Sequence, residues 1–173
     1  MAQTVQRKPN ALRRVLFLCS ENYHESRFCE ELFNSHSRGE GINWLGLSRA
    51  VTAVPALRNE GPMSVTAINY LRVIGAAPVN YLRLPLQVTD FDFQMSYIVI
   101  VLGTDAAQAV RWAWPHYASQ IERWSVPETR ERHSRTTLAA LRREVGALVE
   151  ILQGRAPTVG RPAPQGLGRY AAT

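Results

Sequence analysis

The feature that most constrains the fold is a set of short apolar runs that do not alternate with polar residues. Residues 15–19 are apolar throughout, and residues 97–102 are apolar and rich in β-branched side chains. A strand with one face in water alternates in polarity, whereas a strand of a parallel sheet is covered by helices on both faces. Segments with helical spacing separate the runs, and this order favours parallel strands joined by helices. The sequence therefore predicts an α/β fold: a single doubly wound domain whose four-stranded parallel sheet has helices on both faces.

The expected elements alternate along the chain. We expect strands at 14–19, 43–50, 96–103 and 121–126. From about Ser26 an amphipathic helix is expected to bury Phe28, Leu32 and Phe33 and to turn Glu30 and Glu31 away from the core. Further helices are expected from the N-cap Ser64 to Ile74, after Thr89, from Thr104 towards Trp112, and along the apolar stripe from Leu138 to Leu152.

The two ends of the chain differ from the middle in charge and composition. Residues 1–14 and 153–173 hold seven of the twenty Lys and Arg residues and none of the fourteen Asp and Glu residues, so the middle is nearly balanced. We expect a flexible basic extension at 1–11, a folded domain at 12–152 and a flexible basic tail rich in Pro and Gly at 153–173. No aromatic motif accompanies the basic ends, so nucleic acid is not an expected partner.

Composition also excludes several kinds of site. The longest apolar run is far shorter than the roughly 20 residues of a membrane-spanning helix, and we therefore expect no membrane contact and a cytoplasmic location. The cysteines, Cys19 and Cys29, are too few for a disulfide framework or a four-ligand zinc site. The four histidines show no ligand spacing. We expect neither a metal ion nor another cofactor.

The loop after the first strand is the expected place for chemistry, because ligands of such sheets bind at the carboxyl ends of the strands. Cys19 ends that strand, and the chain then enters a helix near Ser26. Backbone N–H groups and the positive end of the helix can together form an anion cradle there. A thiol facing this cradle is expected to have a pKa below the usual ~8.5, as a nucleophile requires.

At this loop the sequence resembles the low-molecular-weight protein tyrosine phosphatases, a family to which bacterial arsenate reductases are related. That family has an apolar strand, then Cys, five residues, Arg and Ser, and then a helix. Residues 15–33 follow this template without a gap, and the resemblance extends more loosely over 14–152. It implies hydrolysis of phosphotyrosine-type phosphomonoesters through a phosphocysteine on Cys19. The implied phosphate loop consists of Ser20, Glu21, Asn22, Tyr23, His24 and Glu25.

The resemblance also implies roles for three further residues. Asn22 would adopt a left-handed backbone that holds the loop in shape. Ser26 would hydrogen-bond the thiolate. Glu128 stands where the family has the aspartate that protonates the leaving group, although a solvated loop residue is an equal alternative. Thr129 and Arg130 replace the tyrosines that usually follow, which weakens the case for phosphotyrosine specificity.

The main departure from the template is Glu25, which occupies the position of the phosphate-binding arginine. In other phosphoryl-transfer enzymes an arginine that stabilises the transferred group contributes about 10³ to 10⁵ in rate. Glutamate offers acceptors and repulsion instead, and the carboxylates of Glu21 and Glu25 are expected to make Cys19 less acidic than a working phosphatase nucleophile. Arg27 is a poor substitute, because its side chain should leave the helix about 200° around from that of Glu25. The Glu25 carboxylate itself is a candidate occupant of the anion site.

Two classes of function therefore stay open, and whether catalysis survives is open with them. One is a strongly impaired phosphomonoesterase that acts on a phosphorylated protein or a small phosphomonoester. The other is a catalytically inactive binding or regulatory module with a protein partner. A cysteine-dependent enzyme for a non-phosphate substrate is a third, weaker alternative.

Four residues have plain structural interpretations beside functional ones. Cys29 is expected in the helix core, and His24 is expected to be a loop residue rather than a group that shifts the Cys19 pKa. Trp112 and Trp114 are expected in the core or at its rim, with a partner surface as the alternative.

Overall fold

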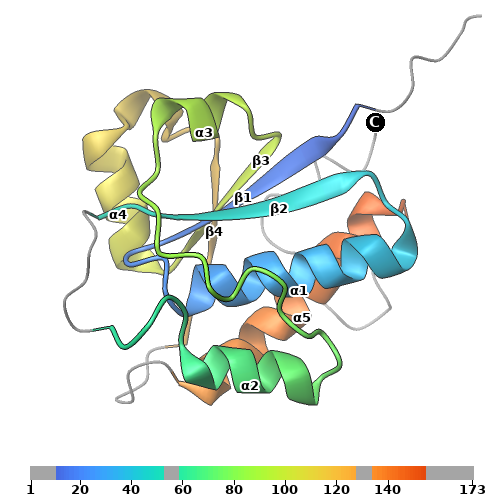
Figure 1. The fold of residues 1–173 in the computed structure, drawn as a ribbon. Coiled ribbons are helices and arrows are strands. Elements are labelled where there is room, and N and C mark those ends of the chain that lie inside the picture. Colours follow the sequence, from blue (N-terminus) through green and yellow to red (C-terminus); the bar gives the residue numbers. More distant parts are fainter. Residues whose placement is uncertain (1–10, 53–58, 128–133, 155–173) are drawn as a thin grey trace, which may run out of the picture.

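The structure is a computed structural model that describes residues 11–52, 59–127 and 134–154. Its sheet consists of β1 (Arg13–Cys19), β2 (Trp44–Ala50), β3 (Ile98–Leu102) and β4 (Ile121–Trp124). The strands are all parallel and lie in the order β2-β1-β3-β4 (Figure 1). The four-stranded doubly wound α/β fold predicted from the apolar runs is confirmed. The expected elements are present, with strand ends that differ from expectation by one or two residues.

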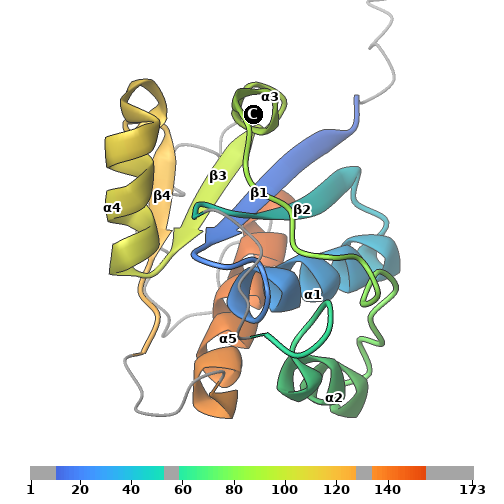
Figure 2. The same ribbon diagram turned by 60° about the vertical axis from the view of Figure 1, so that its left-hand side comes forward.

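Helices cover both faces of the sheet. One face carries α1 (Glu25–Glu40), α2 (Val65–Val73) and α5 (Arg135–Leu152). The other carries α3 (Asp90–Gln94), α4 (Thr104–Ala113) and the 3₁₀ turn η1 (Pro115–Tyr117), as Figures 1 and 2 show. None of the helices that the structure describes is long and apolar enough to cross a membrane.

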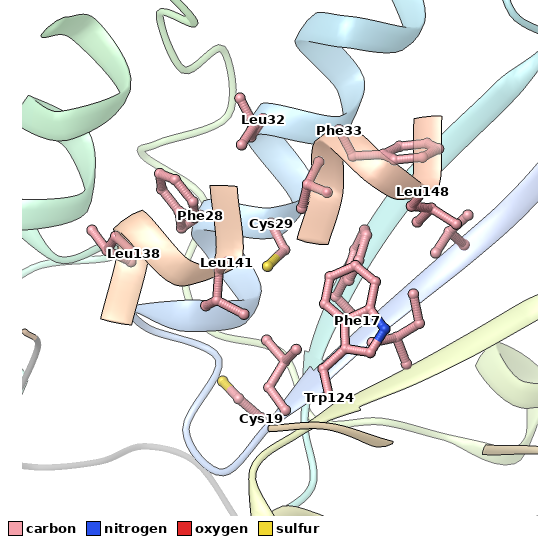
Figure 3. Close-up of a cluster of buried hydrophobic side chains, with 14 of the residues drawn as sticks. Phe17, Cys19, Phe28, Cys29, Leu32, Phe33, Trp124, Leu138, Leu141 and Leu148 are labelled. Atoms are coloured by element: carbon pink, nitrogen blue, oxygen red, sulfur yellow. The ribbon is translucent and has the colours of Figure 1, made fainter. Parts of the chain in front are cut away.

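The inner strand β1 explains why its sequence lacks polar alternation. Val15 and Phe17 belong to the hydrophobic cluster under α1 and α5, whereas Leu16 and Leu18 belong to the cluster under α4. The Phe17 ring lies 5.9 Å from that of Phe33, measured between centroids (Figure 3). Successive side chains of a strand point to opposite faces, so a strand buried on both faces must be apolar at every position.

Local signals set the helix ends as expected. The Ser64 hydroxyl accepts a hydrogen bond from the Ala67 N–H at the start of α2, and Gly75 follows its end with φ +77°. Thr89 and Asp92 form a reciprocal capping box at the start of α3. Such caps satisfy the backbone N–H groups that a first helical turn leaves unpaired.

Two expectations about buried and exposed side chains were wrong. Glu30 and Glu31 are 4% and 2% exposed rather than turned to solvent, because the segment between α2 and α3 covers this side of α1. Trp112 is 88% exposed, since α4 buries Ala106, Ala107 and Val110 on its opposite side. Trp114 is partly buried, as expected, and packs beside Phe93 with ring centroids 5.8 Å apart.

The predicted ends of the folded unit were 12 and 152. The flexible extensions predicted at 1–11 and 153–173 lie almost entirely outside the described residues, and they stay predictions.

Candidate active site

The candidate active site is the loop that joins β1 to α1. Cys19 is the last residue of β1, and Glu25 is the first residue of α1. Figure 3 shows Cys19 where the strand turns into the loop. Because β1 lies between β2 and β3, the loop starts where successive connections leave in opposite directions, which is the usual ligand position in such sheets.

Hydrogen-bond donors converge on the Cys19 sulfur. The Ser26 Oγ lies 2.9 Å from the sulfur, and backbone groups of Asn22 and Ser26 also hydrogen-bond the thiol. Both backbone donors come from the loop and the first turn of α1. A developing thiolate would therefore be met by three donors, which is the arrangement expected around a nucleophilic cysteine.

An anion cradle would lower the pKa of Cys19, whereas in the structure this pKa is raised. Burial raises the pKa of the Cys19 thiol above its usual value, and the nearby Glu25 carboxylate raises it further. The hydrogen bonds from Ser26 and Asn22 lower this pKa but do not reverse the shift. Burial and Glu25 together outweigh the donors, which is the direction expected from the carboxylate at position 25 and opposite to the effect expected of the cradle alone.

We expect Glu25→Gln to lower the pKa of Cys19, because it removes the carboxylate that disfavours the thiolate. The fraction of thiolate near pH 8 should rise, and alkylation of Cys19 by iodoacetamide should become about threefold to tenfold faster. Peptide-resolved mass spectrometry measures this rate from pH 6 to 10. Glu40→Gln, at the far end of α1, is the matched control. Identical pH profiles for Glu25→Gln and the unmodified protein would contradict the effect assigned to Glu25.

Asn22 adopts the left-handed conformation that the resemblance implied. Its φ is +52°, the only positive φ among non-glycine residues in the described part of the chain. The side chain is fully buried, and its Nδ2 donates to Ser26 Oγ (3.0 Å) and Ser48 Oγ (2.8 Å). Its Oδ1 accepts from Leu86 N–H (3.0 Å) and Arg83 Nη1 (3.4 Å). All four hydrogen-bonding positions of the amide are thus used, which ties the loop to β2 and to the segment before α3.

A buried charged cluster lies behind Asn22. The Glu30 carboxylate accepts from Arg83 Nη2 at 2.7 Å and from the Ser48 hydroxyl. Arg83 comes from the segment between α2 and α3, and its Nη2 also lies 3.1 Å from Ser48 Oγ. Sequence reasoning missed this cluster. No local sequence signal marks it: Arg83 stands between Leu82 and Leu84, and only the structure shows that the cation is partly buried while both leucines are exposed.

The contacts of Arg27 lie outside the loop. It is fully buried, donates from Nη2 to the Asn80 carbonyl (2.6 Å) and lies 3.6 Å from the Glu30 carboxylate. These contacts hold the guanidinium against the segment that covers α1. They agree with the expectation that the side chain leaves the helix away from the position of Glu25.

Tyr23 and His24 anchor the loop to other elements. The Tyr23 hydroxyl donates to the Glu60 carbonyl (2.7 Å). His24 Nδ1 lies 2.9 Å from Ser64 Oγ, and Nε2 lies 3.3 Å from the Ser134 carbonyl. Burial lowers the pKa of His24 to about 4, so the imidazole is neutral at pH 7 and donates from Nε2 to Ser134. This geometry favours the interpretation of His24 as a structural loop residue.

The other predicted site residues are placed as follows. Ser20 and Glu21 are partly exposed in the loop, and the Ser20 carbonyl accepts from Thr52 N–H at 3.2 Å. Glu25 is partly exposed at the start of α1. Cys29 is fully buried in the core beside α5, as expected (Figure 3). The predicted acid Glu128 lies outside the described residues.

The geometry of the loop gives no indication of a metal site. Within the described ranges, no group of three or more His, Cys, Asp or Glu side chains could hold a metal ion.

Neither a family model nor a curated protein sequence matches the chain. The chain is similar, however, to several solved structures. YfkJ from Bacillus subtilis superposes with a TM-score of 0.70 at 17% identity, over 84% of this chain and 98% of that one. The low-molecular-weight protein tyrosine phosphatase SP-PTP from Streptococcus pyogenes gives 0.67 at 17% identity, over 80% and 91%. A mutant of the arginine phosphatase YwlE with a phosphorylated active-site serine gives 0.64 at 18% identity, over 81% and 93%.

The likeness covers nearly the whole length of these neighbours. The chain therefore has the fold of the low-molecular-weight protein tyrosine phosphatases. Identities below 20% to these three structures define the fold alone, so the chemistry of the loop has to be argued from this chain's own residues.

Proposed function

We propose that this chain is a phosphatase-like protein that keeps the nucleophile and loop of a phosphotyrosine-type phosphomonoesterase but hydrolyses such esters very slowly. The observation that carries the proposal is the contrast around Cys19. Its sulfur has the hydroxyl of Ser26 at 2.9 Å and backbone donors from the loop, yet the charge at position 25 is negative. Nucleophile and loop shape are retained, while the charge that would hold a phosphate dianion is inverted.

The proposed reaction has two steps. The Cys19 thiolate attacks phosphorus, a P–S bond forms, and the P–O bond to the alcohol breaks as the leaving oxygen takes a proton from a carboxylic acid, for which we propose Glu128. Water then gives a proton back to that carboxylate and attacks phosphorus, which cleaves the P–S bond and releases inorganic phosphate and the Cys19 thiolate. Ser26 stabilises the thiolate that departs in this second step, because its hydroxyl already lies at the sulfur.

Glu25 opposes both steps. A phosphoryl group in the loop would face a carboxylate instead of a guanidinium, and at an effective dielectric near 20 a unit charge pair about 5 Å apart is worth roughly 3 kcal/mol. The same carboxylate raises the pKa of Cys19 and so reduces the population of the nucleophilic thiolate. Substrate binding and nucleophile activation are therefore impaired by a single residue.

We expect the unmodified protein to hydrolyse p-nitrophenyl phosphate at a rate close to that of Cys19→Ser. The reason is that neither charge nor acidity at the loop favours attack on a dianion. The measurement is kcat/KM for both proteins, each checked for native folding by circular dichroism. Brisk hydrolysis that disappears in Cys19→Ser would overturn the proposed impairment, because another residue would then supply the positive charge.

The second candidate function is a catalytically inactive module that binds a phosphorylated protein or another partner. The burial of Cys19 and its raised pKa favour this alternative. Binding of a phosphotyrosine peptide without turnover would support it over slow hydrolysis. For either function we propose a cytoplasmic setting, since both cysteines are free, as is usual in a reducing compartment.

A further inference from the structure

We propose that the amino end of the sheet is a binding surface for single-stranded nucleic acid. This surface consists of Arg13 and Trp44 at the starts of β1 and β2, Tyr97 just before β3, and Arg38 in the last turn of α1. Cys19 lies at the opposite end of the seven-residue β1, roughly 20 Å from Arg13 at the rise of an extended strand. The inference therefore does not depend on the chemistry proposed for Cys19.

Both ends of the chain leave the folded domain at this surface. The described part begins at residue 11, just before β1. It ends at residue 154, directly after Gln153, whose Nε2 donates to Glu40 Oε2 at 2.8 Å and so joins the end of α5 to the end of α1. The turn from α1 leads to the start of β2, which is paired with the start of β1 (Figure 1). The two end segments, which hold seven basic residues and no acidic residue, therefore start from the same end of the sheet.

Two aromatic rings flank a basic side chain at this surface. The guanidinium carbon of Arg13 lies 4.9 Å from the centre of the Tyr97 ring and 5.6 Å from that of Trp44. The two rings pack edge to face with centroids 5.9 Å apart, and Tyr97 is 56% exposed. The sequence places these rings far from the basic ends of the chain, and only the pairing of the strands brings them together. Rings and cation are thus in place before a ligand binds.

This combination fits an unpaired strand of nucleotides. Such a strand offers a phosphate at every step and leaves the face of each base open for stacking on an aromatic ring. The exposed ring of Tyr97 is available for a base. Among the described residues, Arg13, Arg14 and Arg38 form no ion pair, so their charges are available for phosphates. A duplex hides the faces of its bases and offers only its phosphates.

The sequence of the C-terminal segment fits the same partner. Each of its three arginines, Arg155, Arg161 and Arg169, directly follows a glycine. Segments rich in Arg and Gly are found in proteins that bind single strands without sequence preference. Segments that bind anionic membranes instead carry clusters of about four to eight cations. The spacing of these arginines therefore favours nucleic acid over a membrane.

The test is fluorescence anisotropy of a labelled oligouridine of about 20 nucleotides without a terminal phosphate, titrated with the full chain. We expect binding in about 50 mM KCl that weakens roughly 50-fold by about 200 mM KCl, because about four phosphates are neutralised. Oligothymidine should bind equally well, since both strands expose their bases. A duplex of the same length should bind at least about tenfold more weakly. Tighter binding of the duplex would overturn the proposal.

Variants separate stacking from charge. Tyr97→Leu should weaken binding about tenfold with the same salt dependence, because a stacking ring is lost and no charge changes. An unchanged affinity in Tyr97→Leu would overturn the proposal. Arg13→Met should weaken binding and reduce the slope of log affinity against log salt concentration by about 0.7.

Arg72→Met is the matched control. Arg72 also lies over an aromatic ring, that of Tyr81 at 5.8 Å, but it belongs to α2, which lies beyond α1 from the sheet (Figures 1 and 2). We expect its affinity and salt dependence to equal those of the unmodified protein. A loss as large as that in Arg13→Met would overturn the proposal, because any exposed arginine would then have the same effect.

Two measurements distinguish this surface from the loop at Cys19 and from attraction by charge alone. Glu25→Arg, which is expected to strengthen oxyanion binding at the loop, should leave the affinity for oligouridine within about threefold. A gain of about 100-fold would place the strand at the loop and overturn the proposal. Polyglutamate, and phosphatidylcholine vesicles with about one-third phosphatidylserine, should compete poorly because neither stacks on the Tyr97 ring. Competition by either as strong as that by unlabelled oligouridine would overturn the proposal, since charge alone would then explain binding.

Discussion

Glu25→Arg is expected to raise kcat/KM for p-nitrophenyl phosphate by at least about 100-fold over the unmodified protein. The proposed nucleophile Cys19, its hydroxyl partner Ser26 and the left-handed Asn22 are already in position. The substitution removes a carboxylate that raises the pKa of Cys19, and it supplies a planar fork of donors for two phosphate oxygens. A hundredfold gain is a conservative share of what such an arginine supplies elsewhere.

Three further variants separate the causes of this gain. Glu25→Gln removes the repulsion alone, and we expect it to recover only a small part of the rate. Glu25→Lys adds a positive charge without a bidentate fork of donors, so its kcat/KM should lie between those of Glu25→Gln and Glu25→Arg. The double change Cys19→Ser with Glu25→Arg must abolish the gain, which guards against contaminating phosphatases. No gain in folded Glu25→Arg would show that the loop has been remodelled for another task.

Asn22→Ala is expected to destabilise the protein by about 2–4 kcal/mol, because a buried amide with four hydrogen bonds is lost at a left-handed position. The alanine leaves Ser48 and Arg83 with unfilled hydrogen-bond positions and adopts a φ of +52° at a cost. For a domain of this size the expected fall in Tm is roughly 10 °C. Thermal unfolding followed by circular dichroism measures it.

Asn22→Gly and Asn22→Asp are the informative companions. Glycine accepts the left-handed backbone without strain, so it should be less destabilising than alanine although it also lacks the amide. Aspartate keeps the shape of the side chain but cannot donate to Ser26 or Ser48, so Asn22→Asp should destabilise the protein nearly as much as Asn22→Ala. A melting temperature for Asn22→Ala within 2 °C of the unmodified protein would show that the loop does not depend on this side chain.

The fold could be predicted from local patterns because those patterns have direct physical causes. The apolar run of β1 reflects burial on both faces, and Ser64 and Thr89 are placed where helix starts need an acceptor. The loop was predictable for a different reason. The spacing of Cys19, Asn22 and Ser26 resembles a known template, and the structure places Ser26 and the Asn22 backbone at the Cys19 sulfur.

The buried charged residues next to the loop could not be predicted in the same way. Glu30 and Glu31 have the polarity of an exposed helix face, and only the course of the segment before α3 buries them. Arg83 is 53 residues from Glu30 and 61 from Asn22 along the chain, so no local pattern links the three. The prediction for Trp112 was wrong for the opposite reason. A tryptophan is expected in the core because its side chain is apolar, whereas the helical period of α4 turns this one outward.

Shape and charge at the loop are therefore set by different residues. Asn22 and its hydrogen bonds hold the backbone, whereas we propose that position 25 sets the sign of the potential that an incoming oxyanion meets. A single substitution at position 25 can change the second property without the first.

Titration with orthovanadate, a tetrahedral analogue of phosphate, tests this separation most directly. The backbone amide signals of residues 20–26 would be followed by nuclear magnetic resonance in the unmodified protein and in Glu25→Arg. If the loop keeps its shape and lacks only the positive charge, these signals shift in Glu25→Arg at an orthovanadate concentration at least about 100-fold lower than in the unmodified protein. Equal shifts of the same amides at the same concentration in both proteins would contradict the account, because Glu25 would then not control oxyanion binding.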